Sequence, residues 1–318
     1  MRDIRLATAQ FENRDNDKAH NLERMRELVL HAAARDAEVV CFHECCIPGY
    51  TWVQPVSREE LWEVAESVPD GPSVQTLVSL AKETKIDLMA GLFERGEDGQ
   101  IYNTYVAVNG DGLVARHRKI QAFVNPHLAS GNGYTVFEMR GCKFGMLICY
   151  DNNLPENARV TALMGAEVIV APHVTCGLPS KEPGRGVIER TLWDNRHQDP
   201  VRLRQEFVGP KGRAWLMRWL PARAWENGVY YVFSNPIGWD YDTVKPGLAM
   251  ILDPFGEVLA ESHELENDAI VATLTAEKLP IAAGRRYTRA RRPELYEKLV
   301  EPQESVTEPS WSLEKRSS

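Results

Sequence analysis

The sequence has neither a long hydrophobic run nor an excess of positive charge, and these absences exclude several classes of protein. No stretch of about eighteen apolar residues is present, so we expect no membrane-spanning helix. The formal net charge of -8 argues against a nucleic-acid or anionic-membrane partner, because phosphate binding needs clustered positive charge. The arginine-rich segment 285–292 is a local exception, for which ion pairing across an interface is the simplest interpretation.

Cysteine is scarce, and low-complexity sequence is absent. Six cysteines occur in 318 residues, and residues 1–10 are charged and alternating rather than typical of a secretory signal. Both features favour reduced thiols and a cytoplasmic location. Hydrophobic residues make up 43% of the chain, which is enough to form a core without disulfides or a structural metal.

The hydrophobic periodicity predicts an α/β fold. Residues 4–10 alternate like a strand, residues 17–34 carry apolar side chains at helical spacing, and residues 37–42 are again strand-like. Such a strand–helix–strand unit implies a buried, largely parallel region. Further strands are predicted at 87–94, 102–109, 113–117, 143–149, 167–171, 229–234, 248–252, 258–261 and 269–275, and helices at 74–84, 155–165 and 213–227.

Two segments interrupt this alternation. Residues 177–211 are long, polar and rich in proline and glycine at their start, which predicts an excursion over the surface, as a lid or an interface arm. The end of the chain also lacks the pattern of a packed unit. We therefore expect one domain over residues 1–280 and a C-terminal arm over 281–318 that lies at a subunit interface.

Three residues could carry chemistry at predicted strand ends. Cys149 precedes a turn, where a nucleophile would face a pocket and the following N–H groups could face an oxyanion. Glu44 ends a buried strand, the place where open α/β sheets hold their ligands. Lys119 could stabilise a thiolate or an oxyanion by charge. Taken singly, a buried small hydrophobe, a loop glutamate and a solvated lysine are the commoner explanations.

The segments around these residues follow one another in a recognisable order. They are Ala7-Thr8-Ala9-Gln10, Phe42-His43-Glu44, Pro48-Gly49-Tyr50, Arg118-Lys119, Gly145-Met146-Leu147-Ile148-Cys149-Tyr150-Asp151, Pro155-Glu156, Gly165-Ala166-Glu167, Ala222-Arg223-Ala224-Trp225-Glu226-Asn227-Gly228 and Ser234-Asn235-Pro236. This order resembles the nitrilase superfamily of carbon–nitrogen hydrolases over nearly the whole chain.

The resemblance implies a four-layer α-β-β-α sandwich that assembles into homodimers or larger homo-oligomers. It also implies a mechanism without a metal or organic cofactor. Glu44 would take the proton of Cys149, whose sulfur attacks the carbonyl of a small-molecule amide, while the backbone N–H of Tyr150 and the ammonium group of Lys119 hold the oxyanion. Glu44 would then protonate the departing amine and activate water against the thioester.

One part of the family pattern is missing. The family often has a second glutamate shortly after the lysine, but residues 121–136 contain no acid. His127 is our candidate replacement, although an ordinary loop histidine explains it equally well. Tyr50, Phe123, His173 and Thr175 follow strand ends that converge on Cys149, so they are candidate pocket walls, with core packing as the alternative.

The residues after Cys149 bear on the substrate. Cys149-Tyr150-Asp151 resembles the amidase and carbamoylase branches, whereas nitrilases of the family tend to carry Cys-Trp-Glu. Carbamoyl-amino-acid hydrolases commonly place an arginine there to grip a carboxylate, but this chain has Asn152 and Asn153. We therefore expect a neutral or differently anchored amide, with an N-carbamoyl amino acid and then a nitrile as alternatives. Arginines of the excursion could still supply a clamp, namely Arg185, Arg190 and Arg196.

Non-enzymatic interpretations remain open. Cys41, His43, Cys45 and Cys46 could form a metal site or a redox switch, but no second ligand pair stands at a recognisable distance. A scaffold protein is the other alternative, and the presence of all three candidate catalytic residues argues against it.

Overall fold

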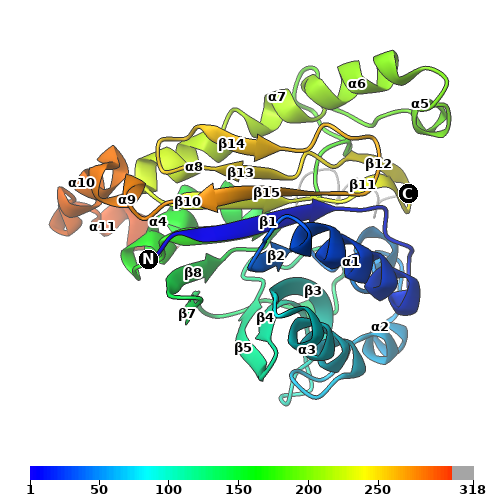
Figure 1. Ribbon diagram of the computed structural model, residues 1–318, viewed down its shortest axis with the longest axis horizontal. Coiled ribbons are helices and arrows are strands. Elements are labelled where there is room, and N and C mark those ends of the chain that lie inside the picture. Colours follow the sequence, from blue (N-terminus) through cyan, green and yellow to red (C-terminus); the bar gives the residue numbers. More distant parts are fainter. Residues whose placement is uncertain (303–318) are drawn as a thin grey trace.

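Two β-sheets packed face to face form the centre of the protein (Figure 1). The computed structural model describes residues 1–302. The strands are β1 Ile4–Gln10, β2 Val39–Cys41, β3 Asp87–Arg95, β4 Ile101–Asn109, β5 Gly112–Arg118, β6 Leu128–Ala129, β7 Thr135–Met139, β8 Cys142–Met146, β9 Val168–Pro172, β10 Tyr230–Ser234, β11 Ile237–Asp240, β12 Thr243–Pro246, β13 Met250–Leu252, β14 Val258–Glu261 and β15 Asp268–Leu274.

Within residues 1–302, the first sheet has the order β15-β1-β2-β3-β4-β5, with β6 beside β4, and the second has the order β14-β13-β10-β9-β8-β7. The strands β1, β2 and β3 run parallel, as do β8, β9 and β10. The carboxyl ends of parallel strands lie at one edge of their sheet. Because the two sheets pack face to face, the segments that follow β2 in the first sheet and β8 and β9 in the second can form a common site. The strands β11 and β12 form a separate hairpin.

Helices cover the outer faces of both sheets. The helices are α1 Lys18–Ala33, α2 Arg58–Val64, α3 Pro72–Thr84, α4 Pro155–Leu163, α5 Arg190–Asp194, α6 Pro200–Val208, α7 Arg213–Leu216, α8 Leu220–Asn227, α9 Lys278–Ile281, α10 Ala283–Arg289 and α11 Glu297–Val300. Among residues 1–302, none of them combines the length and the apolar composition needed to cross a bilayer.

Three apolar cores separate these layers. Met25 of α1 and Leu77 of α3 pack on the first sheet, whereas Ala158 of α4 and Ala224 of α8 pack on the second. The inner faces of the two sheets meet in a third core that includes Met89. The predicted four-layer α-β-β-α sandwich is thereby confirmed.

The structure differs from the sequence prediction in the region 213–227, which is two helices rather than one. Pro221 explains the break, because a proline inside a continuous helix lacks an N–H donor and clashes with the carbonyl four residues earlier. The excursion 177–211 also contains helices, α5 and α6. It packs on the β11–β12 hairpin through a small core that includes Ile188, Trp193, Phe207 and Val244.

The beginning of the predicted C-terminal arm packs closely on the domain. At Gly284, in α10, an added Cβ would lie 2.2 Å from the backbone nitrogen of Gly228, which follows α8. Figure 1 shows α10 beside α8 at one end of the molecule. Residues 303–318 of the arm lie outside the described residues, and its place at a subunit interface stays a prediction.

Gly91 of β3 allows the segment after β2 to approach the sheet. An added Cβ there would lie 2.2 Å from the backbone nitrogen of Cys45, and the N–H of Ile47 donates to the Gly91 carbonyl at 3.2 Å. Glu44 precedes Cys45, so this close backbone contact helps to fix its position.

We predict that Gly91→Ala lowers the free energy of unfolding by about 1–3 kcal/mol, because the methyl group must displace backbone. Urea denaturation measures the loss. Gly133→Ala is the matched control, since an added Cβ meets nothing within 4 Å there. Equal stability of the two variants would contradict this account of Gly91.

Candidate active site

Three buried polar residues from different strand ends come together between the sheets. Glu44 follows β2, Lys119 directly follows β5, and Cys149 begins a 3₁₀ helix, Cys149–Asn153, shortly after β8. Their exposed fractions are 0%, 1% and 7%, respectively. The Lys119 Nζ donates to Glu44 Oε1 at 2.6 Å, and the Cys149 thiol donates to the carbonyl of Val174 at 4.0 Å.

Neighbouring groups hold this ion pair. Asn103 Nδ2 donates to Glu44 Oε1 at 2.7 Å, and the backbone N–H of Val174 donates to Oε2 at 3.2 Å. Lys119 Nζ donates to the Tyr50 hydroxyl at 3.2 Å and lies 4.8 Å from the ring centroid of Phe123. Because hydrogen bonds satisfy both charged groups, their buried positions are fixed.

The electrostatics of the site favour a neutral thiol beside a charged pair. Burial works against the ammonium group of Lys119, but the charge of Glu44, together with the acidic groups of Tyr50, Cys149 and Asp151, outweighs it and holds the Lys119 pKa well above its usual value. Burial raises the pKa of the Cys149 thiol, and the negative charge of Glu44 raises it further, while Lys119 opposes that effect. A thiol in this environment would need a base to become a nucleophile, and Glu44 is the carboxylate whose charge acts on it.

The carboxylate of Asp151 connects the Cys149 turn to the Lys119 segment. It accepts hydrogen bonds from the N–H groups of Ile148 at 3.2 Å, Ile120 at 3.2 Å and Gln121 at 2.8 Å. Cys149 itself has a φ of 49°, a conformation that a residue with a Cβ rarely adopts. The surrounding bonds hold the strained turn in place.

A second brace comes from Arg223 of α8. Its Nε donates to the carbonyl of Asn152 at 3.0 Å, and its Nη2 donates to that of Asn153 at 3.0 Å. The Tyr231 hydroxyl donates to the side-chain oxygen of Asn152 at 2.6 Å. The two asparagines after Cys149 are thus fixed by the second sheet and its covering helix.

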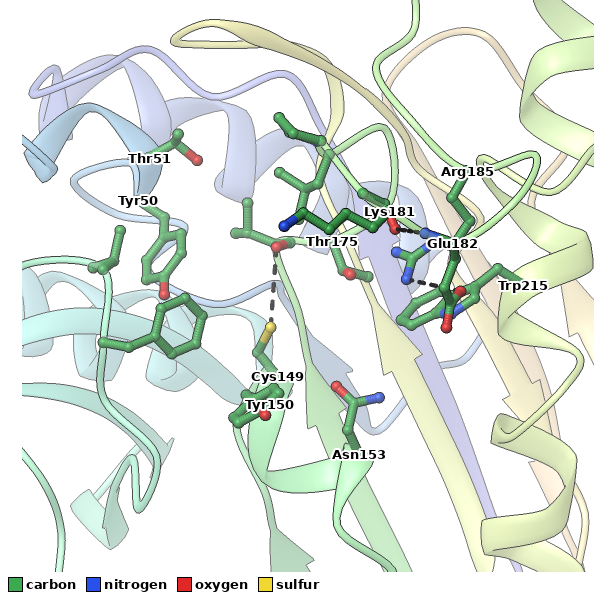
Figure 2. Close-up of a pocket in the computed structure, with 16 residues that line it drawn as sticks. Tyr50, Thr51, Cys149, Tyr150, Asn153, Thr175, Lys181, Glu182, Arg185 and Trp215 are labelled. Carbon is green, nitrogen blue, oxygen red and sulfur yellow. Dashed lines mark hydrogen bonds and ion pairs between the residues drawn. The ribbon is translucent and has the colours of Figure 1, made fainter. Parts of the chain in front are cut away.

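A cavity of about 300 Å³ opens onto Cys149 (Figure 2). Of the predicted pocket residues, Tyr50, Phe123, Tyr150 and Thr175 line it. The others that line it are Thr51, Val124, Cys149, Asn153, Val174, Leu178, Pro179, Ser180, Lys181, Glu182, Arg185 and Trp215.

Two candidate residues lie away from the cavity, and their expected roles are corrected. His127 is exposed and outside the lining, where its backbone N–H donates to Asn125 Oδ1 at 2.8 Å. His173 is fully buried against the rings of Phe233 and Trp219, with centroid distances of 4.9 and 5.6 Å. Burial, assisted by the charge of Lys119, holds the His173 pKa well below its usual value, so it is a neutral packing residue.

Sequence reasoning missed several supporting residues. Asn103 could have been suspected, because it is a polar side chain in a strand that is otherwise mostly apolar. Asn235 stands in a segment that carries the family resemblance, and its Oδ1 accepts the N–H of Thr175 at 2.8 Å. The excursion residues Lys181 and Glu182 gave no signal of their own.

The alternative metal site is not assembled. Within the described part of the chain, no group of three His, Cys, Asp or Glu side chains could hold a metal ion. Cys41 lies against the Met89 sulfur at 3.9 Å, Cys45 against Asn103 Oδ1 at 3.4 Å, and Cys46 against the Gly91 carbonyl at 3.7 Å. These thiols therefore have separate packing partners.

We predict that Glu44→Gln lowers the pKa of Cys149. The substitution removes a negative charge that raises this pKa and leaves Lys119, which lowers it. The ultraviolet absorbance of the thiolate, titrated in each protein and in its Cys149→Ala counterpart, isolates this thiol from the other five cysteines. Lys119→Met is the opposite control and should raise the pKa, whereas a higher or unchanged pKa in Glu44→Gln would refute the assignment.

We also predict that Asp151→Asn destabilises the protein by about 2–3 kcal/mol, because three backbone donors lose a charged acceptor. Chemical denaturation reports the change. Glu156→Gln removes an exposed acid nearby on α4 and should change stability little. If the two variants unfold at the same denaturant concentration, Asp151 does not hold the turn.

Similar proteins cover most of this chain. An (R)-stereoselective amidase of a Pseudomonas species is 29% identical over 262 residues, which are 81% of this chain and 81% of that protein. The omega-amidase NIT2 of Mus musculus is 29% identical over 82% of this chain and 85% of its own length. The structure of an amidase of Nesterenkonia sp. AN1 from the nitrilase superfamily has a TM-score of 0.69 at 21% identity, and the match covers 93% of this chain and 97% of that one.

The family match agrees with the geometry. The carbon-nitrogen hydrolase family model matches residues 5–280, a range that includes both sheets and all three residues of the buried cluster. With this match and the shared fold, the chain belongs to the carbon–nitrogen hydrolase family and is a hydrolase of carbon–nitrogen bonds.

Proposed function

We propose that the protein is an amidase in which Cys149 is the nucleophile, Glu44 the general base and Lys119 the electrostatic partner. One observation carries the proposal: the buried ion pair of Glu44 and Lys119 acts by charge on Cys149, a thiol that lines the cavity. Relatives named as amidases support the choice of an amide substrate.

The reaction follows from the protonation states. Glu44 accepts the proton of the Cys149 thiol as the sulfur attacks the amide carbonyl. The Lys119 ammonium and the backbone N–H of Tyr150 stabilise the negative charge on the carbonyl oxygen. Glu44 then gives its proton to the departing ammonia or amine, and later activates the water that hydrolyses the thioester. Thiol, carboxylate and ammonium groups suffice for these steps, so the mechanism uses no cofactor.

Hydrolysis of an N-carbamoyl amino acid is the second candidate, and Arg185 in the cavity lining favours it, since such a substrate carries a carboxylate. Nitrile hydrolysis is the third and is supported by the nitrilase of Pyrococcus abyssi, 27% identical over 274 residues.

The assembly and the location are proposed on other grounds. Exposed apolar side chains near the C-terminal end of the described chain support a homo-oligomer, among them Ile281, Leu295 and Leu299. Six free cysteines support a cytoplasmic location.

Ammonia release from simple amides, N-carbamoyl amino acids and nitriles tests the proposed function. We expect Cys149→Ala to lower kcat by at least about 10³-fold, since it removes the nucleophile. Lys119→Met should cause a comparable loss, and so should Glu44→Gln, because Glu44 takes part in every proton transfer of the proposed mechanism. Cys142→Ser, a thiol outside the cavity lining, should retain activity. Turnover by folded Cys149→Ala protein would refute the mechanism.

A further inference from the structure

Charged side chains of the excursion line the cavity that opens onto Cys149. Lys181, Glu182 and Arg185 come from this segment, and Figure 2 shows them across the cavity from Tyr50. The ion pair of Glu44 with Lys119 is balanced in charge. Lys181 and Arg185 add two positive charges and Glu182 adds one negative charge, so the lining of the cavity is net positive.

Arg185 is held in a position suited to binding. Its guanidinium lies 4.0 Å from the ring centroid of Trp215, and its side chain is only 15% exposed. Stacking on an aromatic ring orients the planar group and leaves its edge donors available.

The existing ion pair of Arg185 is weak enough to be exchanged. Its Nη1 lies 3.5 Å from Glu182 Oε2, at the limit of a hydrogen bond, and the Glu182 side chain is 54% exposed. Because water reaches Glu182 and screens its charge, a pair of this length contributes little stability. A carboxylate that bound Arg185 in two-point geometry would make shorter and stronger bonds.

The segment that carries Arg185 is anchored at both ends. At Gly177, an added Cβ would lie 2.2 Å from the carbonyl oxygen of Val244 in β12, so the backbone there touches the β11–β12 hairpin. Ile188 is buried in the small core beneath that hairpin. Arg185 therefore lies on a loop with fixed ends.

We propose that Arg185 determines specificity by binding a carboxylate of the substrate, so that the preferred substrates are amides with a carboxylate remote from the bond that is cleaved. This inference rests on the proposed function and names its substrate class. Asn152 and Asn153 offer no positive charge beside the nucleophile, so the anchor comes from the excursion. Lys181 reaches the cavity from the same loop and adds to the positive potential, but it is exposed and contributes less.

The carboxylate could stand on either side of the cleaved bond. On the acyl side, the substrate is the monoamide of a dicarboxylic acid. On the amine side, it is an N-carbamoyl or N-acyl amino acid. Both present the same anion to Arg185, and the assays below separate them.

The test compares kcat/KM for matched substrates with and without the carboxylate. Glutaramate is paired with pentanamide, and an N-carbamoyl amino acid with the corresponding N-carbamoyl alkylamine. In the wild type we expect one carboxylate-bearing member to be preferred by roughly 10- to 100-fold, the value of one charged hydrogen-bonding interaction. The pair in which the carboxylate-bearing member is preferred shows whether the anion stands on the acyl side or the amine side of the cleaved bond.

Arg185→Met should abolish this preference through a higher KM for the anionic substrate, while kcat/KM for the neutral partner stays within about twofold. Arg185→Lys should show a carboxylate preference between those of the wild type and Arg185→Met, because it keeps the charge but not the planar group. Arg190→Met is the matched control: Arg190 belongs to the same excursion, stacks on Trp239 at 4.3 Å and lies outside the cavity lining.

The outcomes separate this inference from the proposed function. Turnover of neutral amides with no carboxylate preference, or a preference that survives Arg185→Met, overturns the role of Arg185 and leaves the amidase intact. If no substrate is hydrolysed, the proposed function fails. Calorimetry with glutarate then tests Arg185 alone: binding that is lost in Arg185→Met supports the site, and no binding, or binding unchanged in the variant, overturns it.

Discussion

The ion pair of Glu44 and Lys119, 2.6 Å long and fully buried, is the interaction on which the rest of the site depends. Removing two charges from water is costly, and the attraction between them compensates only when the geometry is good and the remaining lone pairs and protons are bonded. Asn103, the Val174 N–H and the Tyr50 hydroxyl provide those bonds. The pair is thus tolerated because strands of both sheets converge on it.

Since its members come from different strand ends, the site needs connections between them. Asp151 provides one, because its carboxylate binds N–H groups on both sides of the gap between the Lys119 segment and the Cys149 turn. Arg223 provides another by binding the carbonyls that follow the turn. These bonds keep Cys149 in its unfavourable conformation, so stability elsewhere in the fold supports the geometry that catalysis requires.

The layered fold could be predicted from the sequence because hydrophobic periodicity and strand–helix alternation report burial directly. The same signals predicted which strands end near Glu44, Lys119 and Cys149. They could not predict side-chain direction in the loops beyond, so His127 was expected in the pocket but is exposed. Histidine is a common catalytic residue, but His173 packs against the rings of Trp219 and Phe233 as a core residue does. The prediction of a single helix over 213–227 did not take Pro221 into account, and a second helix begins beside it.

The excursion shows most clearly why local patterns are not enough. Its polar composition predicted a surface segment, and Lys181 and Glu182 are indeed exposed. What composition does not contain is the contact of its start with β12 and the small apolar core around Ile188, which together fix the loop over the cavity. The β11–β12 hairpin, itself absent from the predicted strands, is what the segment packs against. A loop tethered in this way can vary its charged side chains without disturbing Glu44, Lys119 or Cys149, so under the proposed function substrate selection and bond cleavage would be carried by separate parts of the chain.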